Sequence, residues 1–168
     1  RGLQLGIDLG ALYASNVSGE PAGIAATSGI NVVTFGASDP TWAEIVEMEE
    51  AVETDNALMG SLAYIFHPRG KSAAKTTEKA TNTARFIWED GNTVNGYRAL
   101  TTTQVSPGDT WFGNWNDLLV GMWGGLELNV DPYTHSLKGK IRFVAFQTVD
   151  FAVRHAVSFV RGNSGSTP

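Results

Sequence analysis

The sequence predicts an α+β fold in which a mixed or antiparallel sheet is flanked by helices, and three observations carry this prediction. A tryptophan-rich stretch at 111–134 alternates bulky apolar residues with glycines and polar residues, a pattern typical of strands and tight bends. Apolar residues at 42–52 recur at helical spacing. Residues 140–155 alternate over one long run, which predicts a strand that we expect to be the longest of the fold.

Composition limits the class of protein. The chain has 168 residues, enough to bury a sizeable core, and we expect a single globular unit. A hydrophobic content of 42% argues against disorder, and no apolar run approaches the roughly 20 residues of a membrane helix, so a soluble protein is expected. The absence of cysteine excludes disulfides, thiolate metal sites and cysteine nucleophiles. A net charge of -5, without clustered lysine and arginine, gives no sign of a nucleic-acid surface.

The first segment is predicted to be helical. Leu5, Leu9 and Leu12 share one helical face, and although 3–9 also alternates as a strand would, we predict a helix end over 1–12. Because the sequence starts in the middle of this pattern, we expect it to be a fragment of a longer chain.

A surface connection and a short strand are predicted next. Residues 15–24 are rich in turn formers and should run over the surface. Within them, Asn16-Val17-Ser18 matches a glycosylation acceptor, but so short a pattern recurs by chance and nothing indicates secretion, so no glycan is predicted. The β-branched run at 30–35 then predicts a short strand.

The pattern over 42–52 predicts an amphipathic helix with an acidic outer side. Asp39 is expected to cap its first turn, and Pro40 suits the first turn itself. The outer side carries Glu44, Glu47 and Glu50, which form an acidic cluster together with Glu49. Such a cluster suggests a metal site, but it lacks a histidine or a loop pattern of aspartates, so a solvated helix face is favoured.

The following segment predicts a strand and then a helix. The strand covers 62–66 and stops at His67, which is interpreted as a strand-end residue rather than a ligand; the helix is expected over 69–80. Five basic residues occur here, namely Arg69, Lys71, Lys75, Lys79 and Arg85. No aromatic residues are interleaved with them, so an exposed helix face is favoured over a basic binding patch.

The second half of the chain is predicted to form strands. Residues 85–88 and 93–100 should form a hairpin around Asp90-Gly91, because Asp-Gly supplies the positive φ of tight turns. An extended segment and a turn at 106–109 lead to the tryptophan-rich stretch.

The tryptophan-rich stretch predicts a second hairpin. Its strands are expected over 118–123 and 126–130, joined at Gly124-Gly125. The small, polar residues of the end, 162–168, predict a flexible tail.

The histidines give no catalytic signature. His67, His135 and His155 lie in no recognised local motif, and the sequence contains no Gly-x-Ser-x-Gly, Walker loop, His-Glu-x-x-His or dinucleotide fingerprint.

Two other patterns in the sequence resemble parts of known catalytic or binding sites. The glycine-rich residues 121–125 lack the lysine that would hold phosphates, so backbone packing is favoured. Glu127 and Asp131 could form a glycosidase pair, but the sequence does not set their separation and every acidic chain offers such pairs. We therefore assign no catalytic, cofactor-binding or metal-binding residue, expect no cofactor, and predict that the protein is not an enzyme.

The tryptophans suggest an alternative function. Trp111, Trp115 and Trp123 could present flat faces to sugars, as in a β-rich carbohydrate-binding module. Burial is the commoner use of such side chains, because each removes a large apolar area from water. The alternative predicts coplanar, solvent-facing tryptophans, whereas a packed role predicts that most of them are buried.

The order of several short motifs resembles the major capsid proteins of tailed bacteriophages with the Hong Kong 97-type fold. Each motif is short and degenerate, and their order and spacing from about Leu9 to Val160 carry the resemblance. The motifs are Gly19-Glu20-Pro21-Ala22-Gly23-Ile24, Ile65-Phe66-His67-Pro68, Val94-Asn95-Gly96-Tyr97-Arg98, residues 112–121, residues 125–133 and residues 153–159.

The resemblance implies a division of the chain into parts. Residues 1–30 would be the end of the family's spine helix with a connecting loop, in a partial peripheral domain. Residues 31–131 would form the axial domain, 132–161 a strand that returns to the peripheral domain, and 162–168 the tail. The family's amino-terminal arm, extended loop and most of the spine helix would be missing.

The resemblance also implies a structural role in the virion. Subunits of this family form pentamers and hexamers that tile an icosahedral shell around packaged DNA, without sequence-specific binding and without a membrane. The protein would be made in the bacterial cytoplasm. The missing parts clasp neighbouring subunits, so the fragment alone could be monomeric.

Overall fold

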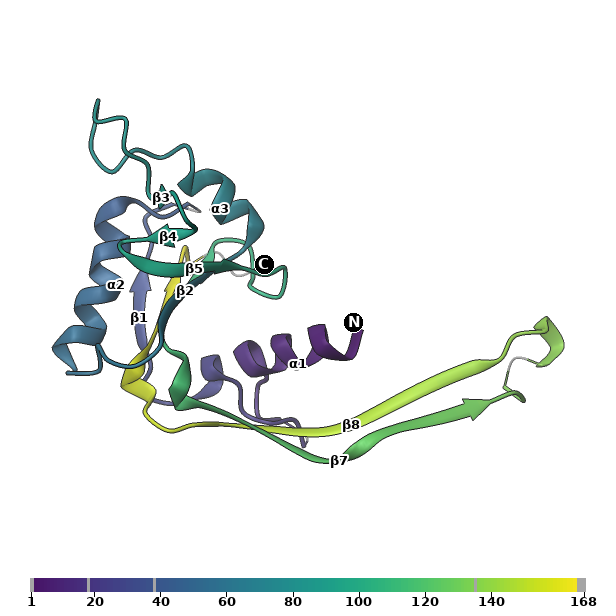
Figure 1. Cartoon of the computed structure of the whole chain (residues 1–168). Coiled ribbons are helices and arrows are strands. Elements are labelled where there is room, and N and C mark those ends of the chain that lie inside the picture. Colours follow the sequence, from purple (N-terminus) through teal and green to yellow (C-terminus); the bar gives the residue numbers. More distant parts are fainter. Residues whose placement is uncertain (1, 18, 38, 135, 166–168) are drawn as a thin grey trace.

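The computed structural model describes residues 2–17, 19–37, 39–134 and 136–165, and it has two visibly different parts (Figure 1). A body is built around a seven-stranded sheet, and a two-stranded arm extends away from it. The α-helices are α1 (Gly2–Tyr13), α2 (Trp42–Thr54) and α3 (Pro68–Ala74). The strands are β1 (Asn31–Thr34), β2 (Leu62–Phe66), β3 (Trp88–Glu89), β4 (Thr93–Val94), β5 (Tyr97–Thr101), β6 (Asp109–Asn114), β7 (Leu118–Asp131), β8 (Arg142–Val153) and β9 (Phe159–Asn163). Short 3₁₀ turns are η1 (Ile24–Ala26), η2 (Trp115–Asp117), η3 (Ser136–Lys138) and η4 (Ala156–Ser158).

The sheet of the body has the strand order β1-β9-β6-β2-β5-β4-β3 and is mixed. β1 with β9 and β2 with β5 are parallel neighbours, and the other neighbours are antiparallel. All residues of the central strand β6 are buried. These findings confirm the predicted α+β class and the mixed sheet. None of the helices among the described residues has the length and apolar character needed to cross a membrane.

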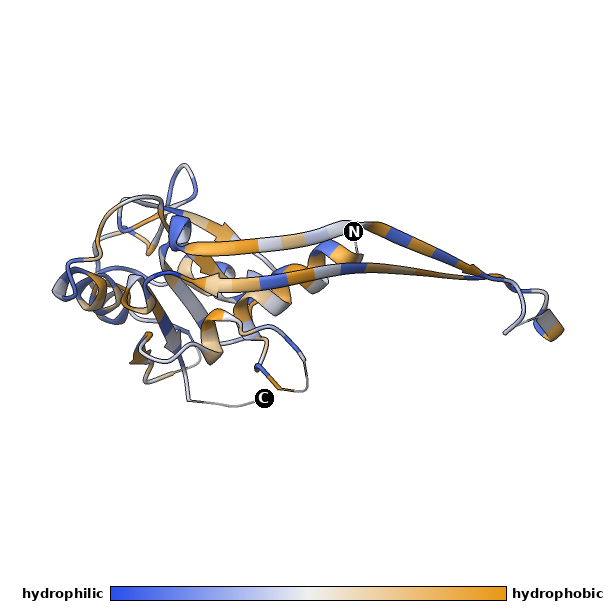
Figure 2. Cartoon of the chain, turned by 90° about the horizontal axis from the view of Figure 1, so that it is seen from below, coloured by the Kyte–Doolittle hydropathy of each residue, from blue (hydrophilic) through white to orange (hydrophobic). Residues whose placement is uncertain are grey.

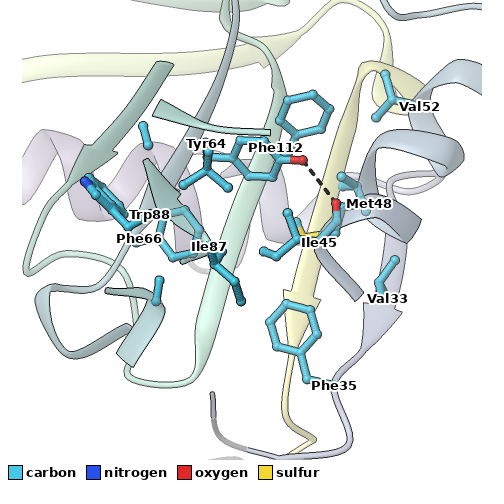
Figure 3. Packing of buried hydrophobic residues seen from close by; sticks show 14 of the residues in the cluster. Val33, Phe35, Ile45, Met48, Val52, Tyr64, Phe66, Ile87, Trp88 and Phe112 are labelled. Carbon is cyan, nitrogen blue, oxygen red and sulfur yellow. Dashed lines mark hydrogen bonds between the residues drawn. The ribbon is translucent and has the colours of Figure 1, made fainter. Parts of the chain in front are cut away.

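The main core lies between one face of the sheet and helices α2 and α3 (Figure 3). Tyr64 and Phe112, from neighbouring strands, stack with their ring centres 4.2 Å apart. The Tyr64 hydroxyl donates a 3.1 Å hydrogen bond to the carbonyl of Ile45 on α2, so the buried polar group is satisfied. Burial raises the pKa of Tyr64 far above its ordinary value. The amphipathic pattern of 42–52 thus forms the predicted helix, with Ile45, Met48 and Val52 inside.

A second, smaller core lies on the other face of the sheet. It joins Leu12 at the end of α1 with Ile24 of η1, and with Trp111 and Phe159 from the central strands. Trp111 has no exposed surface. The helix predicted over 1–12 is confirmed by α1, and its last turn packs on the sheet.

Two glycines let the central strands approach their neighbours. A Cβ on Gly162 would lie 2.0 Å from the Phe35 ring, and a Cβ on Gly113 would lie 2.3 Å from the Ser158 carbonyl oxygen. Neither position has room for a side chain.

The predicted flexible tail starts too early. Gly162 and Asn163 belong to β9, so the prediction is wrong for these two residues. Residues 166–168 lie outside the described residues.

The start of α2 differs from the prediction. Thr41, not Asp39, is the N-cap: its hydroxyl accepts from the amide of Glu44, while the Glu44 carboxylate accepts from the amide of Thr41 at 2.6 Å. This reciprocal pair is a capping box, which satisfies two backbone amides where a single cap would satisfy one. Although partial burial acts to raise it, the amides of Thr41 and Gly36 lower the pKa of the Glu44 carboxyl.

Two further boundaries differ from the sequence prediction. α3 ends at Ala74 rather than near residue 80, and the chain then turns through Asn82 and Ala84, both at positive φ. The predicted strand 93–100 is divided into β4 and β5 by a tight turn at Asn95-Gly96, both at positive φ. The hairpin around Asp90-Gly91 is confirmed by the antiparallel pair β3 and β4.

Candidate functional site

The candidate site is the arm, which we define as β7 and β8 with their connection, residues 118–153. The two strands pair from Leu118 opposite Val153 to Asp131 opposite Arg142. At about 3.3 Å per residue, the 14 residues of β7 span about 45 Å. A two-stranded ribbon of this length has no sheet to support it, so its apolar side chains remain exposed.

The predicted hairpin at Gly124-Gly125 is wrong. β7 continues through both glycines, and the pairing with β8 only shifts register between Trp123 and Glu127. The glycines therefore form an irregularity in one strand, because β8 supplies a continuous partner on both sides of them. The long strand predicted at 140–155 is confirmed as β8, but its 12 residues are fewer than the 14 of β7.

A buried polar cluster fixes the root of the arm. One carboxylate oxygen of Asp117 accepts from the side-chain amide of Asn114 at 2.9 Å and from the hydroxyl of Ser158 at 2.8 Å. The backbone carbonyl of Asp117 accepts from the amide of Arg154 at 2.9 Å. Asp117 precedes β7 and Ser158 follows β8, so this cluster joins both strands where they leave the body.

Asn114 connects this root to the sheet. Its side-chain oxygen accepts from the amides of Ser61 at 2.9 Å and Asn116 at 3.2 Å. Gly60 lies so close that a Cβ there would meet the Asn114 oxygen at 2.6 Å. The arm is thus held by specific hydrogen bonds and not only by chain connectivity.

A second polar cluster holds the end of α1 on the sheet of the body. The Tyr13 hydroxyl donates to the buried Asp109 carboxylate at 2.7 Å and accepts from the Ser106 amide at 3.1 Å and the Trp111 indole at 3.2 Å. Arg161 donates to the same Asp109 oxygen at 2.8 Å. Burial, together with the hydrogen bond to Asp109, raises the pKa of Tyr13.

Helix α1 runs beside the last part of β8, which is the part nearest the body (Figure 1). A Cβ on Gly10 would lie 3.2 Å from the Phe151 ring, so the helix and the strand are in close contact there. Towards the start of α1 they diverge around an open, mostly apolar groove of about 650 Å³, which Leu3, Ile7 and Val149 help to line.

Large apolar side chains are exposed along the arm. Met122, Leu128 and Phe143 each expose more than 60% of their surface. Figure 2 shows apolar and polar residues alternating along its outer part. A monomeric soluble protein seldom exposes so many large apolar residues in one continuous element, so this arm has the chemistry of an interaction surface.

The tryptophans do not form a sugar platform. Trp111 is fully buried, and Trp115 is partly buried with its indole donating 2.9 Å to the carbonyl of Ala63. Only Trp123 among the three is largely exposed, at 58%. One of its ring atoms lies 2.7 Å from where a Cβ of Gly121 would be, which agrees with the predicted packing role of that glycine.

The proposed carboxylate pair is too far apart. Glu127 and Asp131 lie four residues apart on β7, about 13 Å along a strand, whereas glycosidase pairs lie within about 10 Å. Hydrogen bonds from Thr134 and Tyr133 lower the pKa of Asp131, so it serves the turn that follows β7.

The histidines and the acidic helix face have local structural roles. The His67 ring accepts from the amide of Arg69 at 3.1 Å and caps α3, in line with its predicted place at the strand end. His155 precedes η4 and its side chain caps no amide there, and His135 lies outside the described residues.

The acidic residues of α2 also have a structural role. The Glu49 carboxylate accepts from the hydroxyl of Tyr97 at 2.6 Å and from the side-chain amide of Asn95. Within the described residues, no group of three or more histidine or acidic side chains could hold a metal.

The basic residues are not all on an exposed helix face, which corrects that prediction. Lys71 lies 4.6 Å over the Trp88 ring, and Lys79 lies 4.0 Å over the Trp42 ring. Lys79 also pairs with Glu89, which lowers the pKa of that carboxyl. Tertiary contacts thus place each of these lysines over an aromatic ring that is distant in the sequence.

The glycosylation pattern is only partly described by the structure. Asn16 has a positive φ, and Ser18 lies outside the described residues.

Sequence reasoning missed the two buried polar clusters. Asn114 and Asp117 are three residues apart around η2, a local spacing that could have indicated a capped turn. The link between Tyr13 and Asp109 spans 96 positions, and no local signal in the sequence announces it.

Comparisons with known proteins agree with this geometry. Residues 6–164 match the family described as the phage capsid family. The chain is 33% identical, over 159 residues, to the major capsid protein of Halomonas phage phiHAP-1, covering 94% of this chain and 26% of that protein. The chain therefore spans about a quarter of this curated relative.

Solved structures share the fold at low sequence identity. A chain from Mycobacterium phage Ogopogo superposes with a TM-score of 0.69 and 14% identity, covering 95% of this chain and 63% of that one. A chain from the capsid of an empty GTA particle gives 0.68 and 16% identity, covering 98% of this chain and 62% of that one.

Proposed function

The chain belongs to the phage capsid family, and from this membership we propose that it acts as a structural subunit of an icosahedral phage or prophage head. The membership confirms the resemblance that the ordered sequence motifs predicted. The likeness to a capsid chain confirms the fold class as well.

The exposed apolar arm is the observation that carries the proposal. In a monomer, the large apolar side chains of this two-stranded ribbon of about 45 Å stay in contact with water, which is unfavourable. In a shell, an extended element of this kind would reach neighbouring copies, and assembly would bury those side chains. The polar cluster at Asp117 supports the same role, since it holds the arm in one orientation.

Pentamers and hexamers of identical subunits are the proposed partners. Packaged DNA would lie inside the shell without sequence-specific contacts, and the net charge of -5 is compatible with weak adhesion to it. The proposed location is the virion, after synthesis in the bacterial cytoplasm. Family membership points to a structural protein, and we propose no catalytic activity.

The domain division is proposed on the same basis. Residues 1–30 and 132–161 would belong to the peripheral domain and 31–131 to the axial domain. The elements differ from these bounds at two places. Part of β9 falls within 132–161 although the strand lies in the sheet of the body, and β7 falls within 31–131 although it pairs with β8 in the arm. A division that follows the elements would therefore assign the arm with α1 to the peripheral part.

The carbohydrate-binding alternative is not supported. Trp111 is buried and Trp115 is partly buried, so the two cannot join Trp123 in a coplanar exposed platform.

Negative-stain microscopy of the full-length protein tests the proposal. The protein is expressed by itself and together with its neighbouring gene products. Closed shells or ring-shaped capsomers are expected, because the arm should drive contacts between copies. A protein that stays monomeric under both conditions would contradict the structural role.

A further inference from the structure

The turn between β4 and β5 carries the one Asn-Gly pair of the sequence, Asn95-Gly96. An asparagine that precedes glycine is especially prone to spontaneous deamidation, because glycine has no side chain to hinder attack by its own backbone nitrogen. Both residues have positive φ, at 52° and 78°, which is the conformation that a two-residue hairpin turn favours. A chemically labile pair therefore lies where the hairpin needs these two residue types.

Deamidation begins with attack of the Gly96 backbone nitrogen on the side-chain carbonyl carbon of Asn95. A bond forms between these two atoms, and the bond from that carbon to the side-chain nitrogen breaks. The side-chain nitrogen leaves as ammonia, with the proton that the Gly96 amide gives up. Water then opens the five-membered succinimide ring at either carbonyl, which gives aspartate or isoaspartate. Gly96 is exposed, so water, the one co-reactant, reaches the site.

Helix α2 binds the leaving group of this reaction. The side-chain amide nitrogen of Asn95 donates to one carboxylate oxygen of Glu49, and the Tyr97 hydroxyl donates to the other at 2.6 Å. The hydrogen bond to Glu49 raises the pKa of Tyr97 to about 12, so the hydroxyl stays a donor. Figure 1 shows the turn between β4 and β5 beside α2. We call this arrangement, with Asn95 and Tyr97 both bound to Glu49, the docked state.

The nucleophile of the reaction is engaged as well. The Gly96 amide donates to the Glu89 carboxylate at 3.4 Å, a long hydrogen bond, and the same oxygen accepts from the Thr93 hydroxyl at 3.0 Å. Ring closure requires the Gly96 nitrogen to lose its proton and to face the side-chain carbon of Asn95. In the docked state, each of the two reacting groups is therefore bound to a different carboxylate.

We propose that Asn95 is a deamidation site that is protected in the docked state and reacts when the turn separates from α2. The leaving group and the nucleophile are both hydrogen-bonded in the docked state. Breaking a hydrogen bond to a charged group is unfavourable enough to reduce the open population about tenfold or more. The rate of deamidation in the folded protein should therefore follow the opening of the turn.

The product cannot return to the docked state. Either product has a carboxylate in place of the amide donor at position 95, and this carboxylate would be repelled by that of Glu49. Isoaspartate also adds one carbon atom to the main chain of the turn, which displaces the pairing of β4 with β5. Because ammonia is lost, the change is irreversible. The converted fraction would thus record how long the turn has been separated from α2.

Mass spectrometry of the tryptic peptide 86–98 measures the reaction, because Arg85 and Arg98 bound it. One sample is incubated folded under mildly alkaline conditions, and a second is incubated unfolded in guanidinium chloride. Asn95 should convert at least about tenfold more slowly in the folded sample. Asn92 is a slow internal reference in the same peptide, since the branched side chain of Thr93 hinders attack. Equal rates at Asn95 in the two samples would overturn the proposal.

Two variants separate the two hydrogen bonds of Glu49. Glu49→Ala removes the acceptor of Asn95, so the rate in the folded protein should rise at least about tenfold. Tyr97→Phe removes the other hydrogen bond and keeps the one to Asn95, so its rate should stay close to that of the unaltered protein. Equal acceleration in both variants, or none in Glu49→Ala, would refute protection by the bond to Asn95.

Circular dichroism establishes that each variant is folded before its rate is compared. The comparison of folded with unfolded unaltered protein needs no substitution, so it decides the proposal even if Glu49→Ala does not fold.

Discussion

The hydroxyl of Tyr13 donates a 2.7 Å hydrogen bond to the buried carboxylate of Asp109, and this bond joins the end of α1 to the central strand of the sheet. The same hydroxyl accepts from the Ser106 amide and the Trp111 indole. One oxygen atom therefore satisfies three groups of β6 and of the turn that precedes it.

Tyr13→Phe should destabilise the protein by about 1 to 3 kcal/mol, because it leaves the Ser106 amide and the Trp111 indole without their acceptor in a largely buried place, while Asp109 keeps Arg161 as a partner. Thermal unfolding followed by circular dichroism measures the effect. Tyr133→Phe is the control, since Tyr133 is 84% exposed and should change stability little. Equal unfolding temperatures for the two variants would contradict a structural role of the hydroxyl.

Asp117→Ala should loosen the root of the arm. It removes the acceptor for Asn114 and Ser158 and leaves both polar groups buried, at a cost of about 1 to 3 kcal/mol. Hydrogen exchange should show faster exchange at the first residues of β7 and the last of β8. Asp150→Ala is the control, because Asp150 is exposed and accepts only from the amide of Phe151 among the described contacts. Unchanged exchange at the root in Asp117→Ala would refute the role of the cluster.

Gly162→Ala should destabilise β9 by about 1 to 3 kcal/mol or more, because the added Cβ would lie 2.0 Å from the Phe35 ring and would force the core apart. Chemical denaturation gives the difference in the free energy of unfolding. Gly125→Ala serves as the comparison, since a Cβ there meets no atom within 4 Å. A Gly162→Ala protein as stable as Gly125→Ala would show that the ring moves aside freely.

The capping box predicts an acid-dependent part of stability. The pKa of Glu44 is lower in the folded protein than its ordinary value of 4.5, so the charged form is favoured by folding. This contribution is complete above the unfolded pKa and is lost as the pH falls through the folded pKa. Unfolding measured between pH 6 and about pH 3 should therefore show a smaller loss of stability for Glu44→Gln than for the unaltered protein. Parallel curves would contradict the prediction.

The strands of the arm were accessible to sequence reasoning, but their pairing was not. Alternation identified the residues of β7 and β8 as strands, because alternation depends only on local spacing. Whether Gly124-Gly125 reverses the chain depends on where the partner strand lies. β8 provides a partner on both sides of the glycines, so the chain continues there.

The buried polar clusters lay beyond prediction for a related reason. Arg161 and Asp109 are 52 positions apart and meet only because β9 pairs with β6. In the same way, Lys79 reaches the Trp42 ring through the fold of the body and not through neighbouring residues. The motif order identified the family and hence the fold, whereas contacts of this kind depend on the three-dimensional path of the chain.

The position of β9 sets an order of events during synthesis. β9 lies between β1 and β6, and Asn31 of β1 is opposite Val160 of β9, so β1 can join the sheet only after residue 160 has left the ribosome. The arm, 118–153, precedes β9 and emerges first, but Ser158, which ties its root to Asp117, comes only just before β9. A nascent chain consequently exposes the apolar arm before Ser158, which fixes its root, has been synthesised.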